Sequence, residues 1–129
     1  ICVGFVEEVI FRGLLFNAMC KDGLKSAVIV SSLTFGIGHI VNLFNGSGAQ
    51  LLSNLCQVGY AAAVGFLFVI LFLKTGSLIP CIVTHSAVNA LSVFANEGSI
   101  TVTQEIFSAI AIALIALAYS VYLLKKLPK

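Results

Sequence analysis

Three charged residues interrupt an apolar segment in the stretch Val6-Glu7-Glu8-Val9-Ile10-Phe11-Arg12-Gly13. Around them, residues 1–20 are mostly Ile, Val, Leu, Phe, Cys and Ala. Of the 129 residues, 60% are hydrophobic and 9% are charged, whereas an ordinary soluble domain contains about a quarter charged residues. The composition therefore excludes an ordinary soluble domain, and it places these three charges in an apolar environment.

Five apolar segments follow one another along the chain, separated by short polar breaks. They cover residues 1–20, 26–44, 51–73, 78–95 and 102–124. Their lengths match the roughly 20 residues that a helix needs to cross a bilayer. Strands are not indicated, because polar and apolar residues do not alternate over any sustained stretch. We expect one all-α domain over residues 1–129, a polytopic transmembrane bundle of about five helices. Small residues that would allow close helix–helix approach are Gly36, Gly38, Ala61, Ala62, Ala63 and Gly65.

The lysines divide unevenly between the polar breaks. If successive helices alternate in direction, one side of the bundle carries every lysine, and the breaks at 45–50 and 96–101 on the other side carry none. Lysine-rich loops lie on the cytoplasmic side of membrane proteins. We therefore expect an integral membrane protein with its lysine-bearing loops and C-terminus in the cytoplasm. These lysines suit a membrane surface rather than a nucleic acid; they are Lys21, Lys25, Lys74, Lys125, Lys126 and Lys129.

Ionisable residues at membrane depth cost about 2.5–3.5 kcal/mol each, so they are functional candidates. Glu7, His39 and Asn89 fall in one band, about 18–21 Å from the lysine-bearing ends at a rise of 1.5 Å per residue. This shared depth predicts that polar side chains from three helices face one another around a cavity. The full set of candidates is Glu7, Glu8, Arg12, His39, His85 and Asn89.

The helical wheel separates the two glutamates. Glu8 and Arg12 are four residues apart and are predicted to form an ion pair on one helix face. Glu7 points about 100° away, given 3.6 residues per turn. We therefore expect the Glu8–Arg12 pair to brace the helix, which leaves Glu7 as the carboxylate available for chemistry.

The remaining polar side chains suit peptide hydrolysis. A carboxylate shielded from water can act as a general base near neutral pH, and with a nearby imidazole Glu7 can hold and deprotonate a water. His85 and Asn89, one turn apart, offer hydrogen bonds to a developing oxyanion. Zinc hydrolysis is an open alternative, with Glu7, His39 and His85 as three ligands. Because the sequence lacks the His-Glu-x-x-His signature, a mechanism without metal is equally consistent.

Three motifs occur in order on separate predicted helices: Glu7-Glu8-x-x-x-Arg12, Phe35-x-x-x-His39 and His85-x-x-x-Asn89. Together with Gly76-Ser77-Leu78-Ile79-Pro80, they resemble the CPBP family of intramembrane proteases. This family comprises the type II CAAX prenyl endopeptidases and their bacterial relatives, some of which are linked to bacteriocin processing or self-immunity.

The resemblance implies a role for each motif residue. Glu7 and His39 would activate the water, and His85 and Asn89 would stabilise the oxyanion. Support for the site would come from Glu8, Arg12 and Phe35. Because members of the family have about eight helices, the resemblance implies that N-terminal helices are missing from this chain. It also implies a bacterial cell membrane as the location, and the family is often described as metalloproteases.

Three functions remain open at this point. The first is an intramembrane endopeptidase that cleaves lipidated or membrane-associated polypeptides with a C-terminal or membrane-embedded segment. The second is a non-catalytic immunity or scaffold protein that binds peptides in the membrane. The third is a proton-coupled transporter, which would also use membrane Glu and His, although no broken-helix pair or inverted repeat is visible. In each case the bilayer is a partner and nucleic acid is not.

Overall fold

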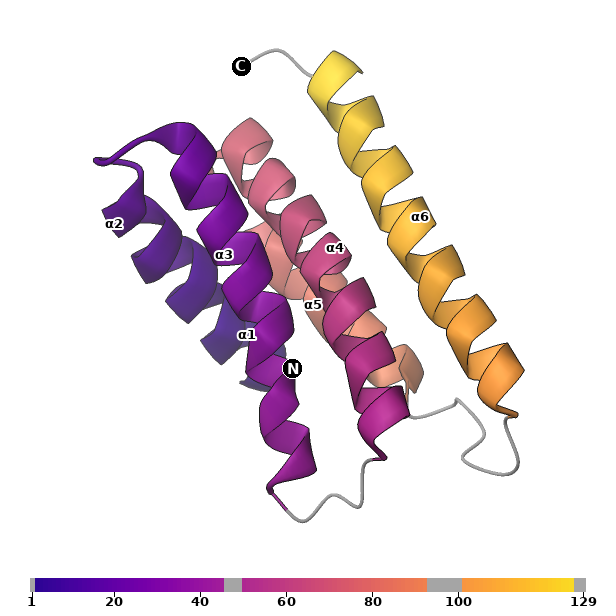
Figure 1. The fold of residues 1–129 in the computed structure, drawn as a ribbon. Helices are drawn as coiled ribbons and strands as arrows, with labels where there is room; N and C mark the ends of the chain where they lie inside the picture. Colours follow the sequence, from indigo (N-terminus) through magenta and orange to yellow (C-terminus); the bar gives the residue numbers. More distant parts are fainter. Residues whose placement is uncertain (1, 46–49, 93–100, 127–129) are drawn as a thin grey trace.

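The computed structural model describes residues 2–45, 50–92 and 101–126. Within these ranges the chain is 90% helical, has no strands and forms five helical segments, which confirms the predicted all-α bundle (Figure 1). The predicted residues 93–95 of the fourth segment lie outside the described ranges. In chain order the elements are α1 (Cys2–Glu8), η1 (Val9–Phe16), α2 (Asn17–Met19), α3 (Leu24–Gly38), η2 (His39–Leu43), α4 (Leu51–Thr75), α5 (Ile79–Ser92) and α6 (Val102–Lys126).

Helix α4 is the centre of the bundle. It contacts the first segment through η1, the second through α3 and η2, and both α5 and α6. Helix α1 packs against α5, so the first and fourth segments are neighbours. Among the described elements, α6 contacts α4 alone, and it runs alongside α4 on the side away from α1 and α3 (Figure 1). Residues from α1, α3 and α5 are therefore gathered on one side of α4.

Small residues let α3 and α4 approach closely. A Cβ atom placed on Gly36 would lie 2.7 Å from the carbonyl oxygen of Val58 and 2.8 Å from the Cβ atom of Ala62. Such distances are far inside van der Waals contact, so only glycine fits at position 36. The predicted close approach is confirmed at Gly36 and Ala62. At Gly38 the nearest atom to an added Cβ, the Cζ of Phe11, would be 3.9 Å away, which is an ordinary contact.

The sharp reversal between α4 and α5 depends on Gly76. Its φ of 64° lies in the left-handed region, which glycine adopts without a steric penalty. Its backbone N–H donates to the carbonyl oxygen of Phe72 at 2.8 Å and so closes the last turn of α4. Pro80 follows in the first turn of α5, where its missing N–H costs nothing. The chain therefore turns back along α4 and carries the third motif into the bundle.

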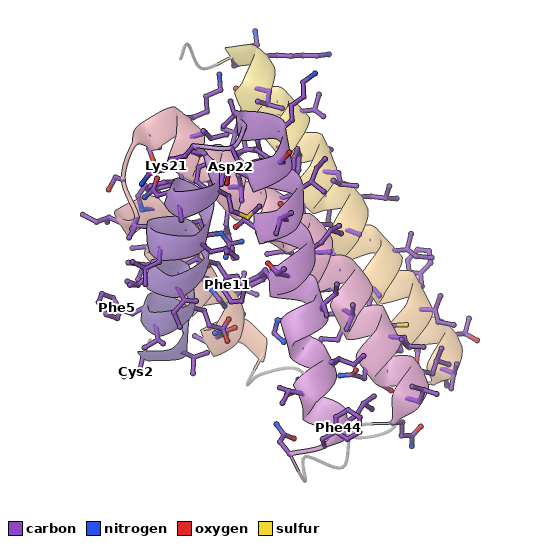
Figure 2. The ribbon with its side chains drawn as sticks, turned by 60° about the vertical axis from the view of Figure 1, so that its left-hand side comes forward. Cys2, Phe5, Phe11, Lys21, Asp22 and Phe44 are labelled. Atoms are coloured by element: carbon purple, nitrogen blue, oxygen red, sulfur yellow. The ribbon has the colours of Figure 1, made fainter. Side chains whose placement is uncertain are left out.

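Three segments are long and apolar enough to cross a membrane: Leu24–Leu43, Leu51–Thr75 and Val102–Lys126. The apolar part of α5, Ile79–Leu91, is shorter, and the first segment carries three charged residues. The alternating helix directions place Lys21 at one end of the bundle, and Cys2 and Phe44 at the other (Figure 2). At the Lys21 end, the Nζ atom of Lys74 donates to the carbonyl oxygen of Leu124 at 3.5 Å. The predicted gathering of lysines at one end is confirmed for the described residues.

Candidate active site

The first helix widens from α to π geometry at Val9, directly after the two glutamates. Short π-helical stretches are rare and are frequent at functional sites. Arg12 lies within this stretch, and its Nη1 donates to Glu8 Oε1 at 3.1 Å. Both side chains are fully buried. The ion pair predicted from their spacing is therefore confirmed.

Arg12 also attaches the first helix to α4. Its Nη2 donates to the carbonyl oxygen of Gly65 at 2.8 Å. The guanidinium carbon lies 4.4 Å from the centroid of the Phe35 ring and 5.2 Å from that of Phe68, within the range of cation–π attraction. A Cβ atom on Gly65 would lie 3.0 Å from Phe35 Cδ1 and 3.3 Å from Arg12 Nη2. Gly65 therefore makes room for the guanidinium among the aromatic rings.

His85 lies between the two glutamates. Its Nδ1 is 2.8 Å from Glu8 Oε1, and its Nε2 is 3.6 Å from Glu7 Oε2. The Glu8 side chain is fully buried, whereas that of Glu7 is 31% exposed. The helical wheel predicted that the two carboxylates lie on different helix faces, with Glu8 in the ion pair and Glu7 available for chemistry. The structure brings both to one imidazole, because the ring enters from α5 and presents one nitrogen to each.

The contact with Glu8 determines which nitrogen of His85 carries a proton. An ionised carboxylate only accepts hydrogen bonds, so Nδ1 is the donor in this contact. Glu7 and Glu8 contribute two negative charges and Arg12 one positive charge, so one negative charge remains while His85 is neutral. A second proton, on Nε2, would make His85 a hydrogen-bond donor at both ring nitrogens, with Nε2 facing Glu7.

His39 is held close to this cluster by its ring and by its backbone. Its ring meets the Phe35 ring edge to face at a centroid distance of 5.6 Å, and Phe35 meets His85 in the same way at 5.5 Å. The Nδ2 of Asn54 donates to the carbonyl oxygen of His39 at 2.8 Å. This bond is made where α3 ends and the 3₁₀ turns of η2 begin. Phe35 therefore packs between both histidines, as its spacing predicted for His39.

Two adjoining cavities surround these side chains. The smaller, about 210 Å³, is lined by both Glu7 and His39. The larger, about 670 Å³, is lined by His39, His85 and Asn89. His39 and Phe35 line both cavities and so form their boundary. The structure therefore brings Glu7, His39, His85 and Asn89 together around one cavity system, as their shared depth predicted.

The donor geometry does not fit the three-ligand zinc alternative. Among residues 2–45, 50–92 and 101–126, no group of three or more His, Cys, Asp or Glu side chains is placed to hold a metal ion. His85 Nδ1 is bonded to Glu8, and only its Nε2 faces Glu7. Glu7, His39 and His85 surround the cavities without forming a common ligand set.

Three residues of the site were not singled out by the sequence. Phe68 stacks on the His85 ring at a centroid distance of 5.2 Å and an interplanar angle of 25°. Asn54 is 1% exposed and holds the His39 carbonyl, and Gly4 lets α1 approach α5 beside His85. Asn54 is visible in the sequence as a polar residue near the start of the third apolar run, but it belongs to none of the three motifs. Phe68 and Gly4 resemble ordinary packing residues, and nothing in the sequence distinguishes them.

Comparisons with known proteins confirm the resemblance drawn from the motifs. The family model described as type II CAAX prenyl endopeptidase Rce1-like matches residues 1–91. CAAX prenyl protease 2 of Homo sapiens is 31% identical in an alignment 91 residues long that covers 64% of this chain and 28% of the human protein. The chain thus spans little more than a quarter of the length of this curated relative. No solved structure gives a significant match.

Helices long enough to span a bilayer and the family match together make this an integral membrane protein. The matched residues contain all three motifs and every side chain of the Glu7, Glu8, Arg12 and His85 cluster. The chain belongs to the Rce1-like family of type II CAAX prenyl endopeptidases.

Proposed function

We propose that this chain carries the catalytic centre of an intramembrane endopeptidase, within one transmembrane domain over residues 1–129. Its substrate is a lipidated or membrane-associated polypeptide with a C-terminal or membrane-embedded segment. One observation carries the proposal: His85 is fixed by Glu8 at one ring nitrogen and faces Glu7 with the other, beside a cavity of about 670 Å³. Membership of the Rce1-like family supports the same activity.

Glu7 is the general base of this mechanism. Acting as a carboxylate, Glu7 lies 3.6 Å from His85 Nε2 and lines the small cavity that His39 also lines. A water held between Glu7 and His39 gives one proton to Glu7 as its oxygen attacks the carbonyl carbon of the scissile peptide bond. When the carbon–nitrogen bond breaks, Glu7 returns that proton to the leaving amine. The proton that leaves the water is the one that reaches the amine, so the reaction balances within these residues.

His85 and Asn89 stabilise the oxyanion from the larger cavity. The attack transfers the electron pair of the carbonyl bond to its oxygen, and the Nε2–H of His85 donates to it. Glu8 holds His85 at Nδ1 and Phe68 stacks on its ring, so the donor is oriented before the reaction. Asn89 lines the same cavity and supplies a second donor. Glu8, Arg12 and Phe35 act through His85 and His39 rather than on the substrate.

Replacing the base tests the proposal directly. Glu7→Gln keeps the shape of the side chain but cannot accept the water proton, and we expect peptide cleavage to fall about 100-fold to 10,000-fold. The assay uses full-length protein in lipid vesicles with a prenylated peptide and an unmodified peptide. Asp22→Asn makes the same acid-to-amide change at an exposed turn and should leave cleavage unchanged. Normal cleavage by the Glu7→Gln protein would refute the proposed mechanism.

A further inference from the structure

The larger cavity extends well beyond the proposed catalytic centre. Its lining includes Phe68 and His85 on one side and Ser53 and Glu105 on the other. Ser53 and Phe68 are fifteen residues apart on α4, about 22 Å along the helix axis at 1.5 Å per residue. The distant part is built by the first turns of α4 and α6 (Figure 1). The residues of α4 in this part lie within the family match, which covers residues 1–91, and those of α6 follow it.

Glu105 directs its carboxylate toward α4. Its Oε2 accepts a hydrogen bond from Ser53 Oγ at 2.9 Å, and the side chain is partly buried. The residue after Ser53 is Asn54, which holds the carbonyl of His39. Two neighbouring residues of α4 thus connect Glu105 with the proposed catalytic centre. At about 3.4 Å per residue, an extended substrate needs about six residues to span the cavity from the catalytic centre to Glu105.

Capping of α6 does not account for this direction. The N-terminus of α6 is already capped, because Thr101 N–H donates to Gln104 Oε1 at 2.9 Å and Gln104 N–H donates to Thr101 Oγ1 at 3.3 Å. A carboxylate pointing outward from the first turn would interact equally favourably with the helix dipole. Glu105 instead lines the cavity, so its position needs a separate explanation.

No basic residue of the described chain neutralises Glu105. Arg12 is paired with Glu8 inside the bundle. Lys21 marks the opposite end in Figure 2, and Lys74 and Lys125 lie with the C-terminal ends of α4 and α6, where Lys74 donates to the carbonyl oxygen of Leu124. The sequence of 46–49 and 93–100, the segments that lead into α4 and α6, contains no Lys or Arg. Glu105 is also the one Asp or Glu among the described residues that line this cavity. The cavity therefore carries a negative charge that the chain does not compensate.

We propose that Glu105 makes the larger cavity a subsite for a positively charged side chain, so that the enzyme favours polypeptides with Lys or Arg about six residues from the scissile bond. This proposal rests on the proposed peptidase function. A cationic side chain would enter with its aliphatic stem along the apolar lining, near Ala109 and Ile112, and its charge at Glu105. Ser53 holds the carboxylate in place for this contact.

A charge exchange tests the subsite. A peptide series places Lys, Gln or Glu at each position from the scissile bond to beyond about six residues on either side, and kcat/KM is measured for full-length wild type, Glu105→Gln and Glu105→Lys. At one position we expect wild type to favour Lys over Gln about fivefold, as for a partly exposed ion pair. Glu105→Gln should remove this preference, and Glu105→Lys should shift it to Glu. Asp22→Asn, which removes a negative charge from the opposite end, should retain the wild-type order.

Two results would overturn the subsite: no wild-type preference for Lys at any position, or a preference that Glu105→Gln leaves unchanged. If no peptide is cleaved by any protein, the peptidase function fails, and binding of the same series decides the subsite. That measurement uses fluorescence anisotropy with the Glu7→Gln protein and the Glu7→Gln, Glu105→Gln double variant. Tighter Lys binding only with Glu105 present supports the subsite, and equal affinities refute it. If Glu105→Lys does not fold, Glu105→Gln alone carries the comparison.

Discussion

Glu8 is the residue at which the buried charges of this protein meet. Its Oε1 accepts from Arg12 at 3.1 Å and contacts His85 Nδ1 at 2.8 Å, so one carboxylate oxygen joins η1 to α5. Arg12 extends the connection to Gly65 on α4. Three segments of the bundle therefore depend on the same buried ions. Glu8 both braces the fold and fixes the ring that faces Glu7.

Removing either Glu8 or Arg12 alone should lower the free energy of unfolding more than removing both. We expect Glu8→Leu and Arg12→Leu each to lower the free energy of unfolding by about 3–5 kcal/mol, because each leaves an uncompensated buried charge. The double variant should lose less than the sum of the two. Urea unfolding in mild detergent, followed by circular dichroism, gives the four values of the cycle. Additive losses would show that the two side chains do not interact energetically.

The hydrogen bond from Asn54 to the His39 carbonyl is a second single contact that supports the proposed site. Asn54→Leu is close in shape but leaves the His39 carbonyl without this donor, so we expect a loss of about 1–3 kcal/mol in unfolding free energy. Peptide cleavage should fall further than stability explains, since His39 loses its support. Asn17→Leu is the matched control: its Nδ2 donates to the Gly13 carbonyl at 2.9 Å on the exposed surface. Equal losses for the two variants would contradict the role given to Asn54.

How much of the site the sequence could predict depends on the distance between partners along the chain. Glu8 and Arg12 were paired correctly because a spacing of four places them on one helix face. The contact of Glu8 with His85 joins residues 77 positions apart, and a helical wheel describes directions on one helix only. Depth in the membrane predicted that Glu7, His39 and Asn89 would be gathered. It could not predict which nitrogen of His85 each glutamate meets.

At the scale of elements, the five apolar runs predicted the helical segments, while the local helix type stayed hidden. Hydropathy gives the length of a segment but not its hydrogen-bond register. The π stretch directly follows Glu8, and the 3₁₀ stretch begins at His39. Each depends on tertiary contacts, with Arg12 bonded to Gly65 and the His39 carbonyl bonded to Asn54. Such departures from α geometry at functional residues could not be derived from the local sequence.

The crossing of α3 and α4 gives an element-scale prediction. Gly36→Ala would push a methyl group to 2.8 Å from Ala62 Cβ and should destabilise the protein by about 1–3 kcal/mol through overpacking. Gly59→Ala is the control on α4, where an added Cβ would meet nothing within 4 Å. That change should be neutral or stabilising by about 0.4–1 kcal/mol, because alanine restricts the unfolded chain. Thermal unfolding in detergent measures both, and equal stabilities would refute the close packing.

At the scale of the whole molecule, the two ends of the bundle differ in charge. Lys21 lies at one end and Phe44 at the other (Figure 2). Glu105 belongs to the Phe44 end, because its Oε2 is bonded to Ser53 Oγ in the first turn of α4. The positive-inside rule predicts that the Lys21 end faces the cytoplasm. The larger cavity would then extend from the centre of the membrane toward the opposite face, where Glu105 would contact the substrate. Orientation therefore decides from which side a cationic segment reaches the subsite.

Thiol labelling in intact bacterial cells tests this orientation. Asp22→Cys and Phe44→Cys each place one exposed thiol at opposite ends of the bundle, in a full-length background where Cys2, Cys20, Cys56 and Cys81 are replaced by alanine. Because lysine-bearing loops resist translocation, a membrane-impermeant maleimide should label Phe44→Cys in intact cells and Asp22→Cys only after lysis. A cytoplasmic cysteine protein monitors leakage. The reverse pattern would place the lysines outside and direct the cavity with Glu105 toward the cytoplasm, so that its cationic substrates would come from within the cell.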